Sequence, residues 1–217
     1  MVCLDRAKEA LYQTKLNLKG KTSKLELIHS RVQDMNLPEN SIDLALWGNS
    51  IHYLDAEEQE EALTKVRHAL KKGGWLFFNS AFYAESRPQE TIVFYRAQVR
   101  RAVEYLKSKG IDRDRMDARP AASNFFSKEY YEDLVKKVGF SLVDVREKVV
   151  RLSGVAMEHI SAFQEYAAGA LHGYNPPDAA EAMKLSVASA MEQYGEPDNN
   201  GILAVRRRWL AISAQVI

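Results

Sequence analysis

The chain has 217 residues, 46% of them apolar, which is enough to bury a substantial core in one domain. Its formal net charge of +1 argues against a dedicated nucleic-acid or membrane-surface protein, because such proteins usually carry a strong basic excess. The single cysteine, Cys3, excludes an internal disulfide and a multi-cysteine metal site, and the lack of a signal peptide and of a bilayer-spanning apolar run favours a cytoplasmic protein.

The first eighty residues alternate apolar strands with amphipathic helices, a rhythm that usually builds a parallel sheet flanked by helices. We expect strands at residues 1–4, 25–29, 42–47 and 75–80, and helices at residues 7–18 and 56–70. The run 42–47 is nearly continuously apolar, which predicts a central strand covered on both faces. Gly73-Gly74 is expected to end the second helix and form a tight turn.

After residue 80 the pattern becomes mainly helical. We expect helices at residues 89–109, 127–138, 154–171 and 178–194, with Pro176-Pro177 separating the last two. A polar loop is predicted at 110–123, a strand at 140–150 and a closing strand through 209–212. Segments 84–124 and 154–194 are expected to form a helical lid over the end of the sheet, all within a single domain of residues 1–217.

An ordered series of short motifs carries more information than any one of them. Asp5 ends the first strand, and the series continues with Val32-Gln33-Asp34-Met35-Asn36-Leu37-Pro38, Ile42-Asp43-Leu44-Ala45-Leu46 and Leu70-Lys71-Lys72-Gly73-Gly74-Trp75-Leu76-Phe77. This order resembles the class I S-adenosylmethionine-dependent methyltransferases that act on small molecules, of the type 11 group. The likeness extends to residues 126–145 and to residues 208–212, which are similar to the family's last, antiparallel strand.

The resemblance implies an α/β fold with a doubly wound, Rossmann-like sheet whose last strand is antiparallel. It implies S-adenosylmethionine as the cofactor and a small-molecule methyl acceptor, with no nucleic acid or membrane as partner. Methyl transfer demands little from side chains, because the sulfonium is already activated and alignment supplies most of the catalysis. The absence of an obvious catalytic triad therefore does not argue against an enzyme.

The resemblance also implies a set of cofactor-binding residues. A carboxylate at a strand's carboxyl end, here Asp5 with Arg6 beside it, can accept both hydroxyls of a ribose, although Asp5 would serve equally well as a cap for the following helix. Further along, Gln33, Asp34 and Met35 would lie beside the adenine, with either Gln33 or Asp34 as the polar partner. The family's backbone meets the methionine part of the cofactor at positions that correspond to Trp47, Gly48 and Asn49.

Other chemistry-bearing residues have weaker signals. His52 follows the same connection and is the candidate catalytic base, since histidine titrates near neutral pH, although a lone histidine after a strand is more often structural.

The aromatic residues Tyr53, Phe82, Tyr83 and Tyr95 could line an acceptor pocket, but we interpret them as core. Arg206, Arg207 and Arg208 cannot form one patch, because the middle side chain of a strand triplet points the other way, and a solvated edge is expected. The sequence contains no metal-ligand set, which predicts metal independence.

The family's glycine-rich loop and first strand should precede Asp5, where only residues 1–4 stand. The resemblance therefore implies an N-terminally truncated domain in which cofactor binding is impaired. Without a first strand, either two unpaired strand edges face each other or strand 1–4 is forced against strand 42–47. The alternative function is a non-catalytic module of the same fold with a partner-binding or regulatory role. A dehydrogenase-type dinucleotide fold fits the Leu-Pro and Lys-Gly-Gly positions less well.

Overall fold

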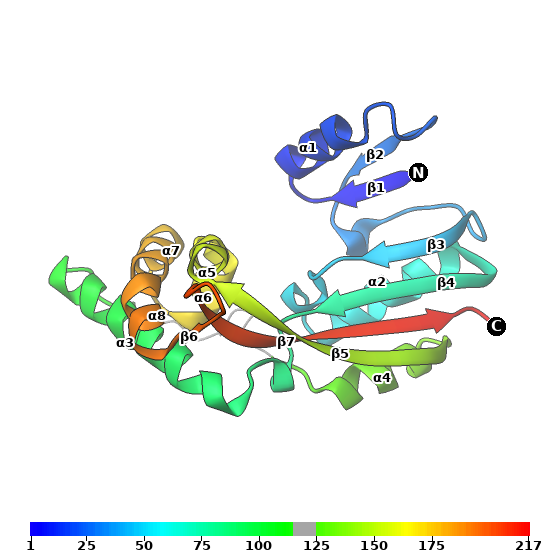
Figure 1. Cartoon of the computed structure of the whole chain (residues 1–217). Helices are drawn as coiled ribbons and strands as arrows, with labels where there is room; N and C mark the ends of the chain where they lie inside the picture. Colours follow the sequence, from blue (N-terminus) through cyan, green and yellow to red (C-terminus); the bar gives the residue numbers. More distant parts are fainter. Residues whose placement is uncertain (115–124) are drawn as a thin grey trace.

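The strands of the computed structural model, which describes residues 1–114 and 125–217, form two sheets (Figure 1). In the smaller sheet, β1 (Val2–Asp5) pairs in parallel with β2 (Glu26–His29). The larger sheet has the order β3 (Ile42–Trp47), β4 (Leu70–Ser80), β7 (Leu203–Gln215) and β5 (Ser141–Ser153), and the short β6 (Glu196–Pro197) pairs with β7. The pair β3–β4 is parallel, whereas β7 runs antiparallel to β4 and β5. The predicted antiparallel last strand is confirmed.

The helices fall into two groups, one that lies beside the strands and one that lies beyond the end of the larger sheet. Those beside the strands are α1 (Lys8–Leu18), α2 (Ala56–Ala69) and α4 (Lys128–Lys137). The others are α3 (Ile92–Ser108), α5 (Gly154–Ser161), α6 (Gln164–Ala170), α7 (Pro176–Leu185) and α8 (Val187–Tyr194). Single 3-10 turns occur at η1 (Val32–Asp34), η2 (Ile51–Tyr53), η3 (Ala84–Ser86) and η4 (Gln89–Thr91).

Helix α2 has the clearest start and stop signals. Asp55 accepts from the backbone N–H of Glu58, and the Glu58 carboxylate accepts from the backbone N–H of Asp55, a reciprocal capping box. Arg67 and His68 lie in the last turn, where cations are favoured by the helix dipole. The helix ends at Ala69, one residue before the predicted end. The prediction that Gly73-Gly74 end it is wrong, because β4 begins at Leu70 and contains both glycines.

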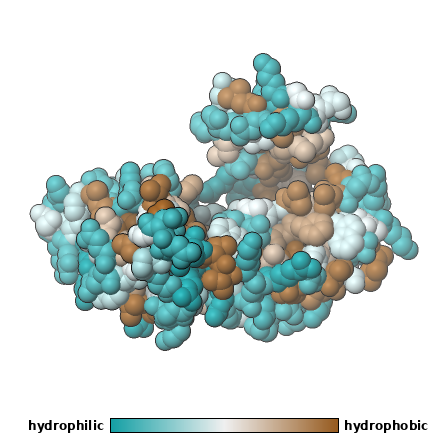
Figure 2. Space-filling view, viewed as in Figure 1, coloured by the Kyte–Doolittle hydropathy of each residue, from teal (hydrophilic) through white to brown (hydrophobic). Residues whose placement is uncertain are grey.

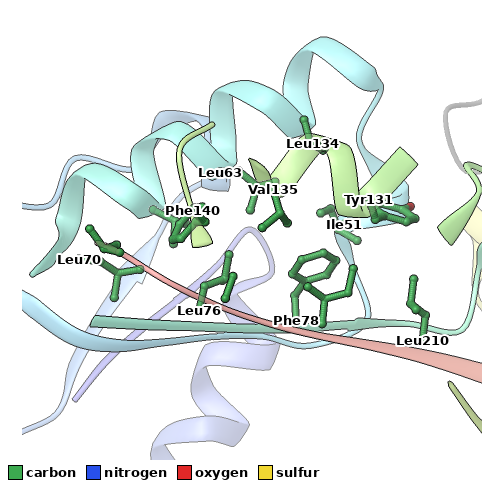
Figure 3. Packing of buried hydrophobic residues seen from close by; sticks show 14 of the residues in the cluster. Ile51, Leu63, Leu70, Leu76, Phe78, Tyr131, Leu134, Val135, Phe140 and Leu210 are labelled. Carbon is green, nitrogen blue, oxygen red and sulfur yellow. The ribbon is translucent and has the colours of Figure 1, made fainter. Parts of the chain in front are cut away.

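The main core lies between one face of the larger sheet and helices α2 and α4 (Figure 3). In Figure 3, Leu63 of α2 and Val135 of α4 point toward Leu76 and Phe78 of β4. Leu63, Leu76 and Val135 have no exposed surface, so the face of β4 that points to these helices is fully covered. Burial of such side chains stabilises a domain by about 1.5–3 kcal/mol each.

The opposite face of the larger sheet is uncovered, which contradicts the prediction that strand 42–47 is covered on both faces. On β3, Leu44 is 49% exposed and Leu46 is 75% exposed, and Phe77 on β4 is 39% exposed. Hydrophobic side chains gather over β3 and β4 in Figure 2. The apolar run was interpreted correctly as a strand, but α2 and α4 both pack on its other side, so two of its five apolar residues, Leu44 and Leu46, are left uncovered.

The edges of β1 and β3 also differ from an ordinary parallel sheet. Within the described part of the chain, β1 pairs with β2 and β3 pairs with β4, but β1 and β3 do not pair with each other. Of the two arrangements expected without an intervening strand, the one with unpaired edges is therefore observed. Arg31 and Gln33 both donate to Glu58 of α2, which ties the smaller sheet's segment to the rest.

The remaining helices form a cluster beyond the ends of β5 and β7 (Figure 1). The predicted bounds of these helices are partly wrong. The expected helix 154–171 is two helices separated at Ala162 and Phe163, and the expected helix 178–194 breaks at Ser186, whose hydroxyl donates to the Met183 carbonyl. The two prolines begin α7 instead of lying between helices, because proline suits the first helical turn.

The closing strand is longer than predicted. β7 has 13 residues, because β5 runs beside it from Ser141 to Ser153 and supplies hydrogen-bond partners beyond the apolar stretch. Part of the predicted lid segment 84–124 and of the predicted loop 110–123 falls at 115–124, outside the described residues.

Candidate functional site

Two asparagines join the carboxyl ends of β3 and β4. The backbone N–H of Asn49 donates to Asn79 Oδ1 at 2.9 Å, and the N–H of Ala81 donates to Asn49 Oδ1 at 2.8 Å. Asn49 has φ 43°, a left-handed conformation that asparagine tolerates better than most residues. The indole N–H of Trp209 also donates to Asn79 Oδ1 at 3.3 Å. These bonds hold the connection after β3 in one conformation.

Gly48 lies on this connection with its backbone accessible. A Cβ added at Gly48 would meet no atom within 4 Å, so open space adjoins this peptide. Next to it, the Trp47 indole donates to Ser50 Oγ at 2.8 Å and packs against the main core. An open hollow of about 480 Å³ includes Trp47, Gly48 and Asn79 in its wall. The site therefore has room beside the backbone at the carboxyl edge of the sheet.

Asp5 ends β1 as predicted, and its side chain makes a local contact. Its Oδ1 accepts from the backbone N–H of Ala7 at 2.8 Å, at the entry to α1. No hydrogen bond to the other carboxylate oxygen occurs among the described residues. The neighbouring Arg6 points elsewhere: its guanidinium pairs with Glu165 of α6 at 2.5 Å. Asp5 thus combines the capping contact with a free oxygen, whereas Arg6 is engaged with the helical cluster.

The three residues of the predicted adenine segment lie in different environments. Gln33 is 6% exposed, its amide donates to Glu58 Oε1 at 2.9 Å, and its carbonyl accepts from Lys65. Asp34 is exposed, with Arg31 only at 4.0 Å. Met35 is partly buried against the main core. Of the two candidate polar partners for adenine, the Gln33 amide already donates to Glu58, whereas the Asp34 carboxylate is available to a ligand.

His52 is buried in η2, with 1% of its surface exposed. Its Nδ1 lies 3.1 Å from Ser80 Oγ, and its ring packs on Phe82 and Tyr53 at centroid distances of 4.3 Å. Burial, and secondarily the charge of Arg207, lowers the pKa of His52 from 6.5 to about 3. The imidazole is therefore neutral at physiological pH, and its buried Nε2 has no hydrogen-bond partner among the described residues.

Replacing His52 with asparagine should remove an acid-sensitive contribution to stability. Below pH 6.5 the unfolded chain binds a proton on His52, whereas the folded chain resists protonation down to about pH 3, so folding stability falls as the pH drops between these values. Between pH 7 and pH 4.5, the free energy of unfolding of the wild type should fall by on the order of 2 kcal/mol more than that of His52→Asn. Urea unfolding at both pH values measures this difference, and equal losses would contradict the assignment.

Sequence reasoning missed Arg207, which is not part of a solvated edge. Its side chain is 1% exposed, its Nε donates to the Ala81 carbonyl at 2.6 Å, and its Cζ lies 4.3 Å from the Phe82 ring centroid. Strand alternation, which the sequence did indicate, turns it inward, whereas Arg206 pairs at the surface with Glu196 and Glu90. Asn79, Ser80 and Arg87 were also missed, because single polar residues at strand ends and in loops carry no pattern.

Three of the four aromatics predicted to be core are buried, whereas Tyr53 is half-buried and belongs to none of the hydrophobic clusters. Phe82, Tyr83 and Tyr95 are 8%, 0% and 4% exposed, respectively. The Tyr83 hydroxyl donates to Glu147 at 2.5 Å, and burial, together with this carboxylate, raises the pKa of Tyr83. Over the described ranges, no group of three or more metal-ligating side chains is found, and no helix has the length and apolarity needed to cross a membrane.

Comparison with known proteins relates this fold to that of the methyltransferases. Residues 1–78 match the family described as a methyltransferase domain. No curated protein matches the chain in sequence. A solved structure from Bacillus halodurans C-125, whose name assigns it provisionally to the methyltransferases, is 12% identical, with a TM-score of 0.58 over 99% of this chain and 81% of that one. A protein from Methanosarcina mazei, named as a SAM-dependent methyltransferase, is 14% identical, with a TM-score of 0.52 over 100% of this chain and 81% of that one.

A third similar structure shows how far the likeness reaches. The 4+2 cyclase SpnF is 12% identical and has a TM-score of 0.55 over 99% of this chain and 66% of that one. Proteins of different named activities therefore share this architecture. At such identities the structural matches establish the fold, a Rossmann-like α/β methyltransferase fold, and the reaction has to be argued from the site.

Proposed function

We propose that this chain, whose residues 1–78 match a methyltransferase domain and whose fold is that of the class I methyltransferases, transfers a methyl group from S-adenosylmethionine to a small-molecule acceptor. The observation that carries the proposal is the open backbone at Gly48, held at the carboxyl edge of the sheet by the Asn49 and Asn79 bonds. Ligands of open α/β sheets bind at this edge.

The residues present fit part of such a cofactor site. The free oxygen of Asp5 suits a ribose hydroxyl, and the exposed carboxylate of Asp34 suits the exocyclic amine of adenine. Gly48 allows close approach of its peptide to the amino-acid portion of the cofactor. Arg6 and Gln33, which were also predicted, are bound to Glu165 and Glu58 and do not contribute free side chains in this conformation.

When bound, S-adenosylmethionine supplies an activated methyl group, and the protein contributes position and exclusion of water. The Asn49–Asn79 bonds hold the connection rigid, which fixes where the Gly48 peptide stands. His52 stays the predicted base: in the neutral ring one nitrogen carries a proton and the other can accept one, but the lowered pKa of His52 makes it a weak acceptor. An acceptor that ionises readily would need no such base.

Asp5→Ala should weaken binding of S-adenosylhomocysteine, the product form of the cofactor, at least about tenfold, because a ribose hydroxyl then loses a charged hydrogen-bond acceptor. Titration calorimetry measures the change in dissociation constant. Asp43→Ala is the matched control, since Asp43 is an exposed carboxylate at the other end of β3 that pairs with Lys71 at the surface. An unchanged constant in Asp5→Ala would remove the ribose assignment.

A second function is favoured by a different observation, the unpaired edges of β1 and β3 together with the exposed Leu44 and Leu46. Unpaired edges and apolar patches are features of surfaces that bind other chains. On this alternative the chain is a non-catalytic module with a partner-binding or regulatory role. Binding of S-adenosylhomocysteine separates the two functions, because a module without catalysis has no reason to retain that affinity.

A further inference from the structure

Two arginines share an aromatic enclosure behind the carboxyl end of β4. Arg207 is on β7, and Arg87 follows η3. The Tyr95 ring contacts both, with its centroid 4.7 Å from Arg87 Cζ and 5.6 Å from Arg207 Cζ. Phe82 covers Arg207 at 4.3 Å, and Phe125 covers Arg87 at 5.1 Å. Aromatic faces attract a guanidinium, but they carry no net charge to balance it.

Neither arginine forms an ion pair with a carboxylate in the part of the chain that the structure describes. Arg207 donates from Nε to the Ala81 carbonyl at 2.6 Å and from Nη1 to the Tyr95 hydroxyl at 3.3 Å. Within residues 1–114 and 125–217, its buried Nη2 has no hydrogen-bond partner, and neither has the buried Nε of Arg87. As far as the structure describes the chain, two guanidinium groups in one low-dielectric enclosure therefore present unsatisfied donors and a positive charge that no carboxylate balances.

The charges of the two side chains act on each other. Burial lowers the pKa of Arg87, Tyr166 acts in the opposite direction, and the charge of Arg207 again lowers this pKa. A nearby anion would remove this mutual repulsion, because an opposite charge favours the charged form of each guanidinium. Among the described residues no carboxylate offsets the two like charges, so a bound anion would stabilise the pair.

The enclosure adjoins the candidate methyl-transfer site. The Phe82 ring that covers Arg207 on one side packs against the His52 ring at 4.3 Å. His52 in turn contacts Ser80, the last residue of β4, and β4 ends where the Asn49–Asn79 connection begins. A molecule held by the arginines would therefore be anchored close to the carboxyl edge of the sheet.

We propose that Arg87 and Arg207 bind an oxyanion, a carboxylate or a phosphate, of the small molecule that this protein acts on. The proposal rests on the proposed function for the role of that molecule as methyl acceptor. Guanidinium donors suit the paired oxygens of both anions, and the unsatisfied Arg207 Nη2 and Arg87 Nε are the donors available to them. The rings of Phe82, Tyr95 and Phe125 suit an acceptor whose body is planar or apolar. The acceptor class is thus an anionic small molecule.

Binding of simple anions to the full chain, in the absence of cofactor, tests the proposal. Sodium benzoate, phenyl phosphate and the neutral, similarly shaped benzamide serve as probes in titration calorimetry and thermal unfolding. At least one of the two anions should bind and raise Tm with concentration, while benzamide should not. The stronger of the two identifies the oxyanion as carboxylate or phosphate. Arg87→Gln should weaken the binding at least tenfold.

Arg100→Gln is the matched control, because Arg100 is an exposed arginine on α3 and its loss removes the same charge without touching the enclosure. Equal binding of benzamide, unchanged binding in Arg87→Gln, or no binding of either anion would overturn the proposal. Arg207→Gln is a second variant, and Arg87→Gln carries the test if Arg207→Gln fails to fold. Titration with S-adenosylhomocysteine is independent of this result, so a failed anion site and a failed methyltransferase assignment are distinguishable.

Discussion

Gly48→Val is expected to weaken S-adenosylhomocysteine binding about a hundredfold while leaving the fold intact. Forcing extra methyl groups into an occupied site costs about 1–3 kcal/mol, which corresponds to a loss of affinity of up to about a hundredfold. The added side chain begins in open space, since a Cβ at Gly48 meets no atom within 4 Å, so the substitution should fill the ligand's place without straining the protein. Titration calorimetry gives the affinity, and thermal unfolding checks the fold.

Glu39→Val is the control for this variant, because Glu39 is exposed in the turn before β3, at the opposite end of the same strand. It introduces the same side chain away from the site and should leave the affinity unchanged. If Gly48→Val binds the cofactor product as tightly as the wild type, the peptide after β3 does not face the ligand, and the site has to be placed elsewhere.

Leu76→Ala should destabilise the protein by about 2–5 kcal/mol, the second large effect, because the truncation leaves a cavity in a packed core. Leu76 lies in β4 with no exposed surface, beneath α2 and α4 (Figure 3). Leu46→Ala, in the paired strand β3, should change stability by less than about 0.5 kcal/mol, since that side chain is 75% exposed. Urea unfolding measures both. A similar loss in the two variants would show that the uncovered sheet face is covered in solution.

The order of elements was largely predictable because it depends on local signals. The apolar residues 42–47 mark a strand, and Asp55 before a run of helix formers marks a helix. Neither signal depends on distant parts of the chain. The breaks at Ala162 and Ser186 were not predictable, because they depend on how the helices pack and not on a glycine or proline. The uncovered face of β3 was unpredictable for a related reason. A run of apolar residues indicates that a strand can be buried, but it does not show whether another element packs on each face.

Within the site, positions were easier to predict than contacts. Asp5, Gly48 and Asn49 fall at strand ends, which the hydrophobic pattern locates. Whether a polar side chain there is free depends on partners far away in the sequence, such as Glu58 for Gln33 and Glu165 for Arg6. Buried arginines are the extreme case, since Arg207 reaches the Ala81 carbonyl across 126 residues of chain.

Titration calorimetry of the full chain with S-adenosylhomocysteine tests the central claim most directly, after circular dichroism has shown that the chain is folded. Binding with a micromolar dissociation constant is the predicted result, and it would mean that the carboxyl edge around Asp5 and Gly48 is a working cofactor site. A folded chain that shows no binding would contradict the methyltransferase assignment and favour the non-catalytic module.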